Sequence, residues 1–377
     1  MGRLAIIEPH LSDYSCDTFM GLLDYCDLDF VFSPTPGASG FGAVTITNPR
    51  ARCIVIPTLR PFRRNLGMFQ AGIAAYLFRE RPGAIILNAN PRYLSFWNTL
   101  LLGRLLGIPV YAHGHGVFKK RKISYLYRLM MNSLLRLSSG YICYAPIVRD
   151  TFVEHGFSGE KLSVADNSII NHFPVRPSEK NGNELGILFT GRLREGSNIA
   201  LLARVIERFR MHEGIPLTLH IIGDGGEAER LRKDWRDRHW LTFYGAVYEH
   251  ARLREISLSC FAGCYPGNAG LSVVHMMSLS LPVLTHSEMQ CHQGPEPSFV
   301  EDGISGMLFN RRSEESSLYQ GLRSLVGNRE KLTKMQNAAY EKYQSLVDPP
   351  LAARFWSIVS SGLQKGSQLP ADTPLRT

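Results

Sequence analysis

Short apolar runs alternate with amphipathic stretches along this chain, and the alternation occurs twice. Strands that are buried on both faces are apolar throughout, so this pattern predicts parallel β-sheets covered by helices. In the first half, the pattern predicts strands at 5–8, 29–34, 52–57, 83–90, 108–116 and 140–145, with helices at 67–80, 92–106 and 123–138.

A polar, proline-containing stretch at 171–184 then interrupts the alternation. Proline and small polar residues between periodic segments are typical of a linker. The alternation restarts with predicted strands at 185–193, 217–226, 241–245, 260–266 and 282–286, with predicted helices at 197–212, 227–238, 249–258 and 270–280, and with a helical region at 330–365.

The pattern therefore predicts an α/β fold of two Rossmann-like, doubly wound parallel-sheet domains that face each other across a cleft. A chain of 377 residues is also too long for one ordinary core. Ligands of such sheets bind at the carboxyl ends of the strands, so we expect the chemistry in the loops there. We expect an N-terminal domain at 1–172, a linker at 173–184, a C-terminal domain at 185–348, a helix at 349–365 that packs back on the N-terminal domain, and a tail at 366–377.

The composition is that of a soluble globular protein, with 44% hydrophobic and 20% charged residues. The first ten residues, MGRLAIIEPH, are typical of a core strand rather than of a signal peptide. The longest apolar region, 94–111, is broken by Arg104 and Pro109, so we expect no transmembrane helix. These features predict a cytoplasmic protein.

The seven cysteines are an odd number, scattered and mostly in apolar contexts, which favours reduced thiols in a cytosolic compartment. A zinc site would draw on Cys260, Cys264, Cys291 and His292. Closed zinc sites usually use tighter paired spacings than these. We therefore expect no metal and no other cofactor.

The formal net charge of +9 is concentrated in the first half, where residues 1–175 hold 18 Lys and Arg against 11 Asp and Glu. Two clusters dominate, Arg60 with Arg63 and Arg64, and the run 119–122. A basic face attracts phosphate-rich partners, here an anionic membrane surface or a diphosphate-linked acceptor. Nucleic acid is a poor candidate, because the clusters carry little aromatic interleaving.

Three loops of the second half have a form suited to phosphate. FTGRLREGSN (189–198) follows a strand and offers the Arg192 guanidinium, and IIGDGGEAERL (221–231) is a glycine-rich turn that opens a helix. The third, CYPGNAGLSVVH (264–275), places a flexible turn before a helix whose N–H groups would be unpaired. His275 lies about one turn into that helix, although a single helical His is more often structural.

The ordered set GRL, IIGDGGEAERL, FYGAV, PGNAGLSVVHMMSLSLPV and PEPSFVEDGISGMLF, across 185–312, resembles the group-1 (GT4-type) glycosyltransferases of the GT-B fold. In the first half, YAHGHGVFKKR (111–121) and KLSVADNSII (161–170) are similar to family segments more loosely. The resemblance implies transfer of a sugar from a nucleotide donor, generally with retention, without a metal. Arginine and amides would then neutralise the leaving diphosphate.

The resemblance also implies roles for residues of the second half. Arg192 would hold the donor diphosphate, and His275 would stand near the ribose. The backbone amides of Gly267, Asn268, Ala269, Gly270 and Leu271 would cradle the diphosphate, and Gly223, Gly225, Gly245 and Val247 would border the base.

The chain departs from the family pattern at several of these positions. Gly267 and His275 stand where the family has paired glutamates, and Ser197 stands where it commonly has a lysine. Arg194 is close enough to replace that lysine. Glu296 or Glu288 is expected to supply the hydrogen-bond acceptor that the missing glutamates would have provided.

In the first half, His113 would lie near the transferred sugar as the catalytic residue. His113 is flanked by Gly114, His115 and Gly116 at the end of an apolar strand, so we expect exposed rings. We expect the acceptor to be bound by Asn90, Arg92, His115 and Lys119, although an Asn before Pro91 is equally a turn residue.

Together these features predict a glycosyltransferase of the hexosyltransferase kind, acting on a glycan or a polyprenyl-diphosphate-linked acceptor in surface-polysaccharide or glycoconjugate biosynthesis. A sugar-nucleotide epimerase or hydrolase on the same fold is an alternative, but it would need cleft carboxylates for proton transfer. A non-catalytic binding subunit is another. The GDGG turn lacks the full glycine fingerprint of a dinucleotide-dependent oxidoreductase.

Overall fold

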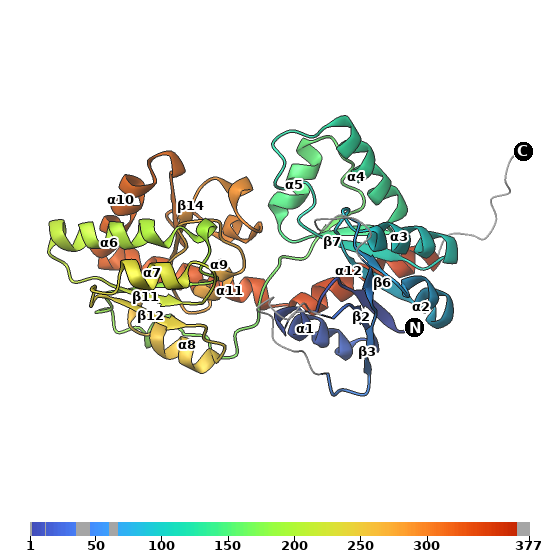
Figure 1. The fold of residues 1–377 in the computed structure, drawn as a ribbon, viewed down its shortest axis with the longest axis horizontal. Helices are drawn as coiled ribbons and strands as arrows, with labels where there is room; N and C mark the ends of the chain where they lie inside the picture. The colour runs from blue at the N-terminus through green and yellow to red at the C-terminus, as the bar shows by residue number, and fades with distance from the viewer. Residues whose placement is uncertain (1, 12, 35–45, 60–66, 368–377) are drawn as a thin grey trace, which may run out of the picture. The chain divides into compact units, whose positions relative to one another are not determined.

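The computed structural model describes residues 2–11, 13–34, 46–59 and 67–367. The cluster Arg60, Arg63 and Arg64 lies outside these residues. The described chain divides into two compact units (Figure 1), the first running up to Asp166 and resuming at Pro349, the second running from Asn167 to Asp348.

The first unit is built on a parallel sheet of seven strands in the order β3-β2-β1-β6-β7-β8-β9. The strand β1 is buried at every position, as a central strand covered on both faces must be. Its strands are β1 (Leu4–Ile7), β2 (Leu28–Phe32), β3 (Ala51–Val55), β6 (Ala84–Asn88), β7 (Val110–Gly114), β8 (Gly140–Cys143) and β9 (Leu162–Val164), with a separate antiparallel pair of β4 (Thr58–Leu59) and β5 (Phe69–Gln70).

One face of this sheet is covered by α1, the short helix η1 and α12, which brings the end of the chain back to the first unit. Phe19, Leu22, Phe355 and Val359 pack there in one core cluster with residues of β1 and β2. The helices of the unit are α1 (Asp13–Met20), η1 (Gly21–Asp24), α2 (Ile73–Glu80), α3 (Leu94–Leu106), α4 (Tyr125–Leu137), α5 (Pro146–Glu154) and α12 (Leu351–Ser367).

The second unit is built on a parallel sheet of six strands in the order β12-β11-β10-β13-β14-β15. Every residue of β10 and β13 is buried. Its strands are β10 (Gly186–Thr190), β11 (Thr218–Ile222), β12 (Leu241–Gly245), β13 (Cys260–Cys264), β14 (Val283–His286) and β15 (Gly306–Phe309).

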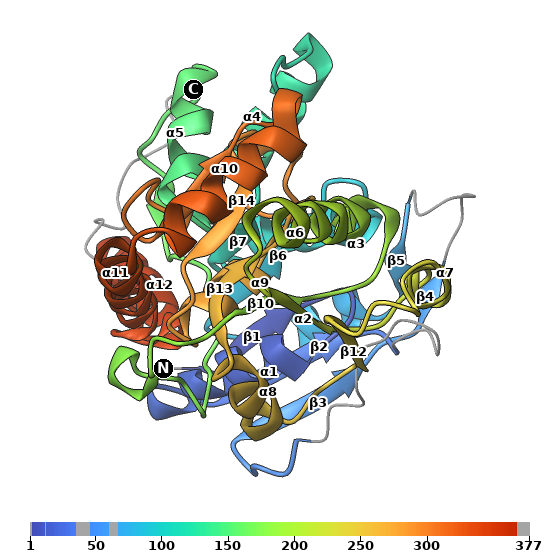
Figure 2. The same cartoon turned by 90° about the vertical axis from the view of Figure 1, so that its left-hand side faces the viewer.

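The helices α6 and α10 lie side by side on one face of the second sheet, and α8 lies on the other face (Figures 1 and 2). The unit contains α6 (Ile199–Glu213), α7 (Ala228–Asp234), α8 (His250–Ser257), α9 (Ser272–Met277), α10 (Glu314–Val326) and α11 (Arg329–Val347), and the short helices η2 (Pro177–Glu179), η3 (Glu195–Ser197), η4 (Met289–Cys291), η5 (Glu296–Phe299) and η6 (Arg311–Ser313).

The prediction of an α/β fold with two Rossmann-like parallel-sheet domains is confirmed. The residues 173–184, expected as a linker, are packed against the second unit instead. Val175 N–H donates to Ser278 O at 3.0 Å, and Lys180 Nζ donates to Ser257 O at 2.6 Å. The structure therefore places residues 173–184 within the second unit.

The structure corrects the bounds of several predicted helices. The expected helix 67–80 begins at Ile73, because Gly72 has φ +129° and β5 precedes it. The expected helix 270–280 covers only Ser272–Met277, and Ser280 has the left-handed φ of +54°. The expected helical region 330–365 is two helices, broken between Asp348 and Pro350, as a pair of prolines requires.

Candidate functional site

The second sheet has a switch point between β10 and its neighbour β13. From β10 the chain order continues through β11 and β12 towards one edge of the sheet, and from β13 it continues through β14 and β15 towards the other edge. All of its strands are parallel, so their carboxyl ends lie at the same edge. A crevice at the carboxyl ends beside a switch point is where open α/β sheets bind ligands. The loops that follow β10 and β13, at 191–198 and 265–271, flank it, and both contain predicted site residues.

Glycine allows the loops after β10 and β11 to contact each other through their backbones. Leu193 N–H donates to Asp224 O at 3.0 Å, and Glu227 N–H donates to Leu193 O at 2.9 Å. A Cβ on Gly223 would lie 1.8 Å from Gly191 O, so no other residue fits there. The φ of Gly223 is +141°, which also requires glycine.

The loop 267–271 packs in the same way on the loop after β10. Asn268 N–H donates to Gly196 O at 2.8 Å, and a Cβ on Gly267 would lie 2.1 Å from the same oxygen. Ala269 N–H donates to His292 Nδ1 at 3.1 Å. Two of the five amides predicted to cradle a diphosphate thus already have acceptors, whereas those of Gly267, Gly270 and Leu271 have none among the described residues.

Of the two predicted arginines, Arg192 is exposed and Arg194 is half-buried. The Arg194 guanidinium donates from Nη2 to Asn268 O at 3.3 Å and to the side-chain oxygen of Gln293. Arg194 therefore joins the loop after β10 to the loop 267–271. A guanidinium held beside loop amides is a suitable partner for phosphate oxygens.

His275 lies against His250, the first residue of α8, with ring centroids 5.7 Å apart. Burial, and then the neighbouring His250, lower the pKa of His275 to about 4, so the ring is neutral at pH 7. Its Nε2 is buried and has no hydrogen-bond partner within the described chain. An orphan buried nitrogen is costly and is consistent with a partner that arrives with a ligand.

The segment before α8 carries the residues predicted to border a base. Gly245 ends β12 with φ +73°, and its carbonyl accepts from Gly223 N–H at 2.7 Å. Val247 follows two residues later and is half-buried. The contact of His275 with His250 thus brings the predicted ribose residue to the end of this segment.

Glu296 is buried, with 2% of its surface exposed, next to the loop 267–271. Its Oε1 accepts from Asn167 Nδ2 at 2.6 Å, and a Cβ built on Gly270 would lie 3.7 Å from its Oε2. The other candidate, Glu288, is half-buried and 3.9 Å from Arg311. Glu296 therefore lies beside Gly270 of the predicted diphosphate loop, and its partner Asn167 was not among the predicted site residues.

In the first unit His113 is buried, with 3% exposed, and the expectation of an exposed ring is wrong. Its Nε2 is 2.9 Å from Glu8 Oε1 and its Nδ1 is 2.9 Å from Tyr144 Oη. The rings of Phe19 and Phe355 pack edge-on against it. A hydrogen bond between a ring nitrogen of His113 and a sugar would have to replace one of these two hydrogen bonds.

The glycines around His113 have a packing role. Gly116 has φ +51°, and a Cβ there would lie 2.1 Å from the Phe152 ring. Gly116 N–H donates to Tyr141 Oη at 2.8 Å. His115 is exposed, and its ring packs edge-on against Tyr144 at 5.1 Å.

The remaining residues predicted to bind the acceptor lie at the surface of the first unit. Asn90 Oδ1 accepts from Arg92 N–H at 3.3 Å, so this asparagine forms the turn before α3. The side chains of Arg92 and Lys119 are exposed.

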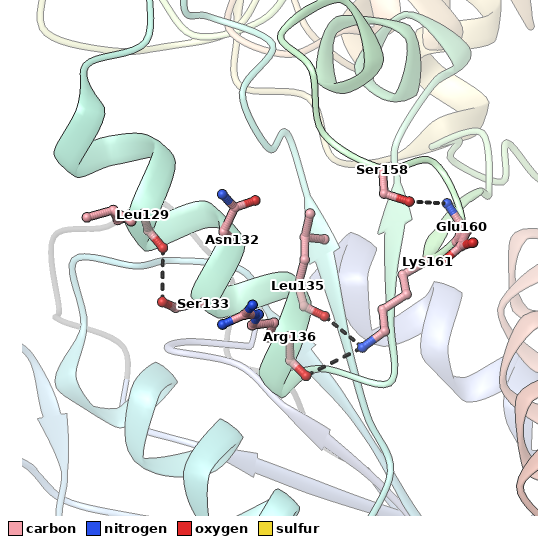
Figure 3. Close-up of a pocket in the computed structure, with 8 residues that line it drawn as sticks. All are labelled: Leu129, Asn132, Ser133, Leu135, Arg136, Ser158, Glu160 and Lys161. Carbon is pink, nitrogen blue, oxygen red and sulfur yellow. Dashed lines mark hydrogen bonds between the residues drawn. The ribbon is translucent and has the colours of Figure 1, made fainter.

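A cavity of about 480 Å³ in the first unit lies beside α4, away from these predicted residues (Figure 3). The Lys161 ammonium beside it donates to Leu135 O and Ser138 O at 2.8 Å each. Lys161 therefore caps the end of α4, and Arg136 is the other cation that lines the cavity. The sequence analysis did not predict this cavity.

All seven cysteines are described, and none forms a disulfide. Burial raises the pKa of Cys143 and of Cys260 to about 12, which keeps both thiols protonated. Within the described residues, no three His, Cys, Asp or Glu side chains are grouped so as to hold a metal ion. No described helix has the length and apolarity that a membrane crossing requires.

Residues 174–342 match the family model described as glycosyl transferases group 1, and residues 26–170 match the one described as glycosyltransferase family 4. No curated protein sequence shows significant similarity to the chain.

Among solved structures, Anabaena Alr3699/HepE in complex with UDP and glucose matches with a TM-score of 0.69 at 13% identity, over 96% of this chain and 100% of that one. Sucrose-phosphate synthase from Thermosynechococcus elongatus matches with a TM-score of 0.70 at 14% identity, over 97% and 100% of the two chains. The lipopolysaccharide outer core galactosyltransferase WaaB matches with a TM-score of 0.68 at 13% identity, over 95% and 99%. At these identities the likeness shows the GT-B fold, and the two family matches support a group 1 glycosyltransferase.

Proposed function

We propose that this protein transfers a sugar, with retention, from a nucleotide-sugar donor to a glycan or lipid-linked oligosaccharide acceptor. The observation that carries the proposal is the convergence of the loops after β10, β11 and β13 at the switch point of the second sheet. These loops lie within the group 1 match. Similar structures hold UDP or UDP-glucose, which supports a nucleoside diphosphate as the leaving group.

The arrangement suits departure of a diphosphate without a metal ion. Negative charge develops on the leaving oxygen as the bond between the sugar and the diphosphate of the donor breaks. The guanidinium groups of Arg192 and Arg194 and the amides of Gly270 and Leu271 are the groups that would stabilise this charge. The contacts of Arg194 with Asn268 and Gln293 orient its guanidinium before the reaction.

Two further residues would hold the rest of the donor. The neutral ring of His275 leaves a nitrogen for a ribose hydroxyl, beside the segment 245–247 that would border the base. The buried carboxylate of Glu296, oriented by Asn167, would accept from hydroxyl groups of the sugar. In this proposal these two side chains do the work of the paired glutamates found in the family.

The transfer assay mixes the full chain with nucleotide sugars of different base and sugar and measures release of the nucleoside diphosphate with and without acceptor glycans. Acceptor-dependent release supports the proposal. Release or epimerisation of the donor without acceptor would instead indicate a hydrolase or an epimerase. No turnover and no binding of any donor would favour a non-catalytic subunit.

For the acceptor we propose a polyprenyl-diphosphate-linked precursor at the cytoplasmic face of an anionic membrane, in surface-polysaccharide or glycoconjugate biosynthesis. The first turns of α4 expose Tyr125, Leu126 and Leu129, with 73%, 77% and 46% of their surfaces accessible. The basic run 119–122 directly precedes them. Exposed apolar side chains beside lysines suit a surface of anionic lipids.

Vesicle sedimentation tests the membrane part separately. We expect binding to anionic vesicles that weakens with added salt, and weaker binding for Leu126→Gln. Asn132→Gln, at an exposed position further along α4, is the matched control. Equal binding to neutral and anionic vesicles would contradict the membrane part and leave the transferase proposal standing.

A further inference from the structure

The segment 292–296 holds the loop 267–271 through its backbone. Gln293 N–H and Gly294 N–H both donate to Ala269 O, at 2.7 and 3.4 Å, while Ala269 N–H donates to His292 Nδ1 at 3.1 Å. Both polar groups of the Ala269 backbone are therefore bound by one segment. Ala269 directly precedes Gly270 and Leu271, whose amides have no hydrogen-bond acceptor among the described residues.

The hydrogen bonds of His292 define the protonation state of its ring. Its Nδ1 accepts from Ala269 N–H, so this nitrogen carries no hydrogen. Its Nε2 lies 2.8 Å from His286 O, which can only accept, so Nε2 carries the hydrogen. The ring is thus the neutral Nε2–H tautomer. A protonated ring would carry a hydrogen on Nδ1 as well, and that N–H would face the N–H of Ala269.

The surroundings of the ring keep it in place. His292 is fully buried and stacks on His286, with ring centroids 3.8 Å apart and an interplanar angle of 5°. Burial, and then His292 and Arg311, lower the pKa of His286 to about 3, so the His286 ring of this stack is neutral at pH 7. The contacts fix the orientation of His292 without a charge.

We propose that His292 positions the donor loop: its neutral ring accepts from Ala269 N–H and thereby keeps the Gly270 and Leu271 amides directed at the donor diphosphate. His292 acts through Ala269 and touches neither donor nor acceptor. The inference rests on the proposed function, since it assigns a use to the amides of the same loop.

Two substitutions separate the two nitrogens of the ring. In His292→Asn the side-chain oxygen stands near the position of Nδ1 and can accept from Ala269 N–H. In His292→Gln the amide nitrogen stands near the position of Nε2, so the bond to His286 O is kept and the acceptor for Ala269 is lost. His286→Phe is the control, because it changes the stacked ring and keeps the backbone oxygen.

The probe is whichever of UDP, GDP, ADP, CDP and TDP binds the unmodified protein most tightly, measured by calorimetry. We expect a Kd within about threefold of the unmodified value for His292→Asn and His286→Phe, and at least about tenfold weaker binding for His292→Gln. In the transfer assay, His292→Gln should raise the KM for the donor more than it lowers kcat. Equal affinities for the Asn and Gln variants, or a larger loss for Asn, would overturn the inference.

Hydrogen exchange on the unmodified protein tests the contact without any variant or ligand. We expect the Ala269 amide to be protected and the Gly270 and Leu271 amides to exchange fast. Fast exchange at Ala269 would overturn the inference even if the variants failed to fold. Failure of every nucleotide to bind the unmodified protein, with Ala269 protected, would instead contradict the proposed function.

Discussion

Gly223→Ala places a methyl group at the point where two loops of the candidate donor site touch. The new Cβ would lie 1.8 Å from Gly191 O and 2.9 Å from Gly191 C. Both are backbone atoms, so no side chain can rotate out of the way. The loop after β10 must move, and it carries Arg192 and Arg194 with it.

Two costs add at this position. A non-glycine residue at φ +141° costs about 1 to 3 kcal/mol. Overpacking against a rigid neighbour costs about 1 to 3 kcal/mol more. The free energy of unfolding of the second unit should therefore fall by about 4 kcal/mol, which lowers its Tm by roughly 8 to 16 °C for a unit of this size.

Differential scanning calorimetry measures this shift, and calorimetric titration measures the affinity for a nucleoside diphosphate. Gly226→Ala is the matched control in the same loop, because its Cβ would meet nothing within 4 Å. We expect a near-native Tm and affinity for Gly226→Ala, and a lower Tm with weaker nucleotide binding for Gly223→Ala. Melting of the two variants within about 2 °C of each other would refute the packing of these loops.

Three further variants test other parts of the molecule. Asp29 is buried, and although burial raises its pKa, hydrogen bonds from Arg52, Arg3 and Tyr76 bring the pKa below its usual value. Its contribution to stability is therefore present above about pH 4 and is lost as the pH falls through its lowered pKa. The free energy of unfolding in urea should consequently depend less on pH in that range for Asp29→Asn than for the unmodified protein. His275→Ala should weaken nucleoside diphosphate binding about tenfold with an unchanged far-UV spectrum, and unchanged affinity would return His275 to a structural role. Gly116→Ala should lower the Tm well below that of Gly107→Ala, because Gly107 has a similar φ but open space at its Cβ. Equal Tm values would mean that backbone strain alone, and not the contact with Phe152, sets the loss of stability.

The strands could be predicted because burial on both faces makes them apolar throughout. The runs predicted at 5–8, 185–193 and 282–286 all contain the observed strands almost whole. Helix ends were harder, since they depend on single backbone angles. Ser280, near the end of α9, is one such residue: it adopts a left-handed φ, and its hydroxyl donates to Val175 O. The local sequence does not predict this conformation.

The candidate site could be predicted where glycine loops follow strands and could not where it depends on contacts between distant segments. Glu296 and Asn167 are 129 positions apart and meet through one hydrogen bond. His113 was expected at the surface from its glycine neighbours, but Glu8 and Phe355, from the two ends of the chain, enclose it. Such contacts come from the topology, which local patterns do not contain.

The central claim is that the loops of the second unit bind the diphosphate of a nucleotide-sugar donor. Calorimetric titration of UDP, GDP, ADP, CDP and TDP tests it on the unmodified protein, on Arg194→Ala and on Arg236→Ala, a control at an exposed arginine outside these loops. We predict that at least one nucleotide binds, that Arg194→Ala weakens it by about 10- to 100-fold, as loss of a charged hydrogen bond does, and that Arg236→Ala leaves it unchanged. No binding by any nucleotide, or equal binding by the two variants, would contradict the claim.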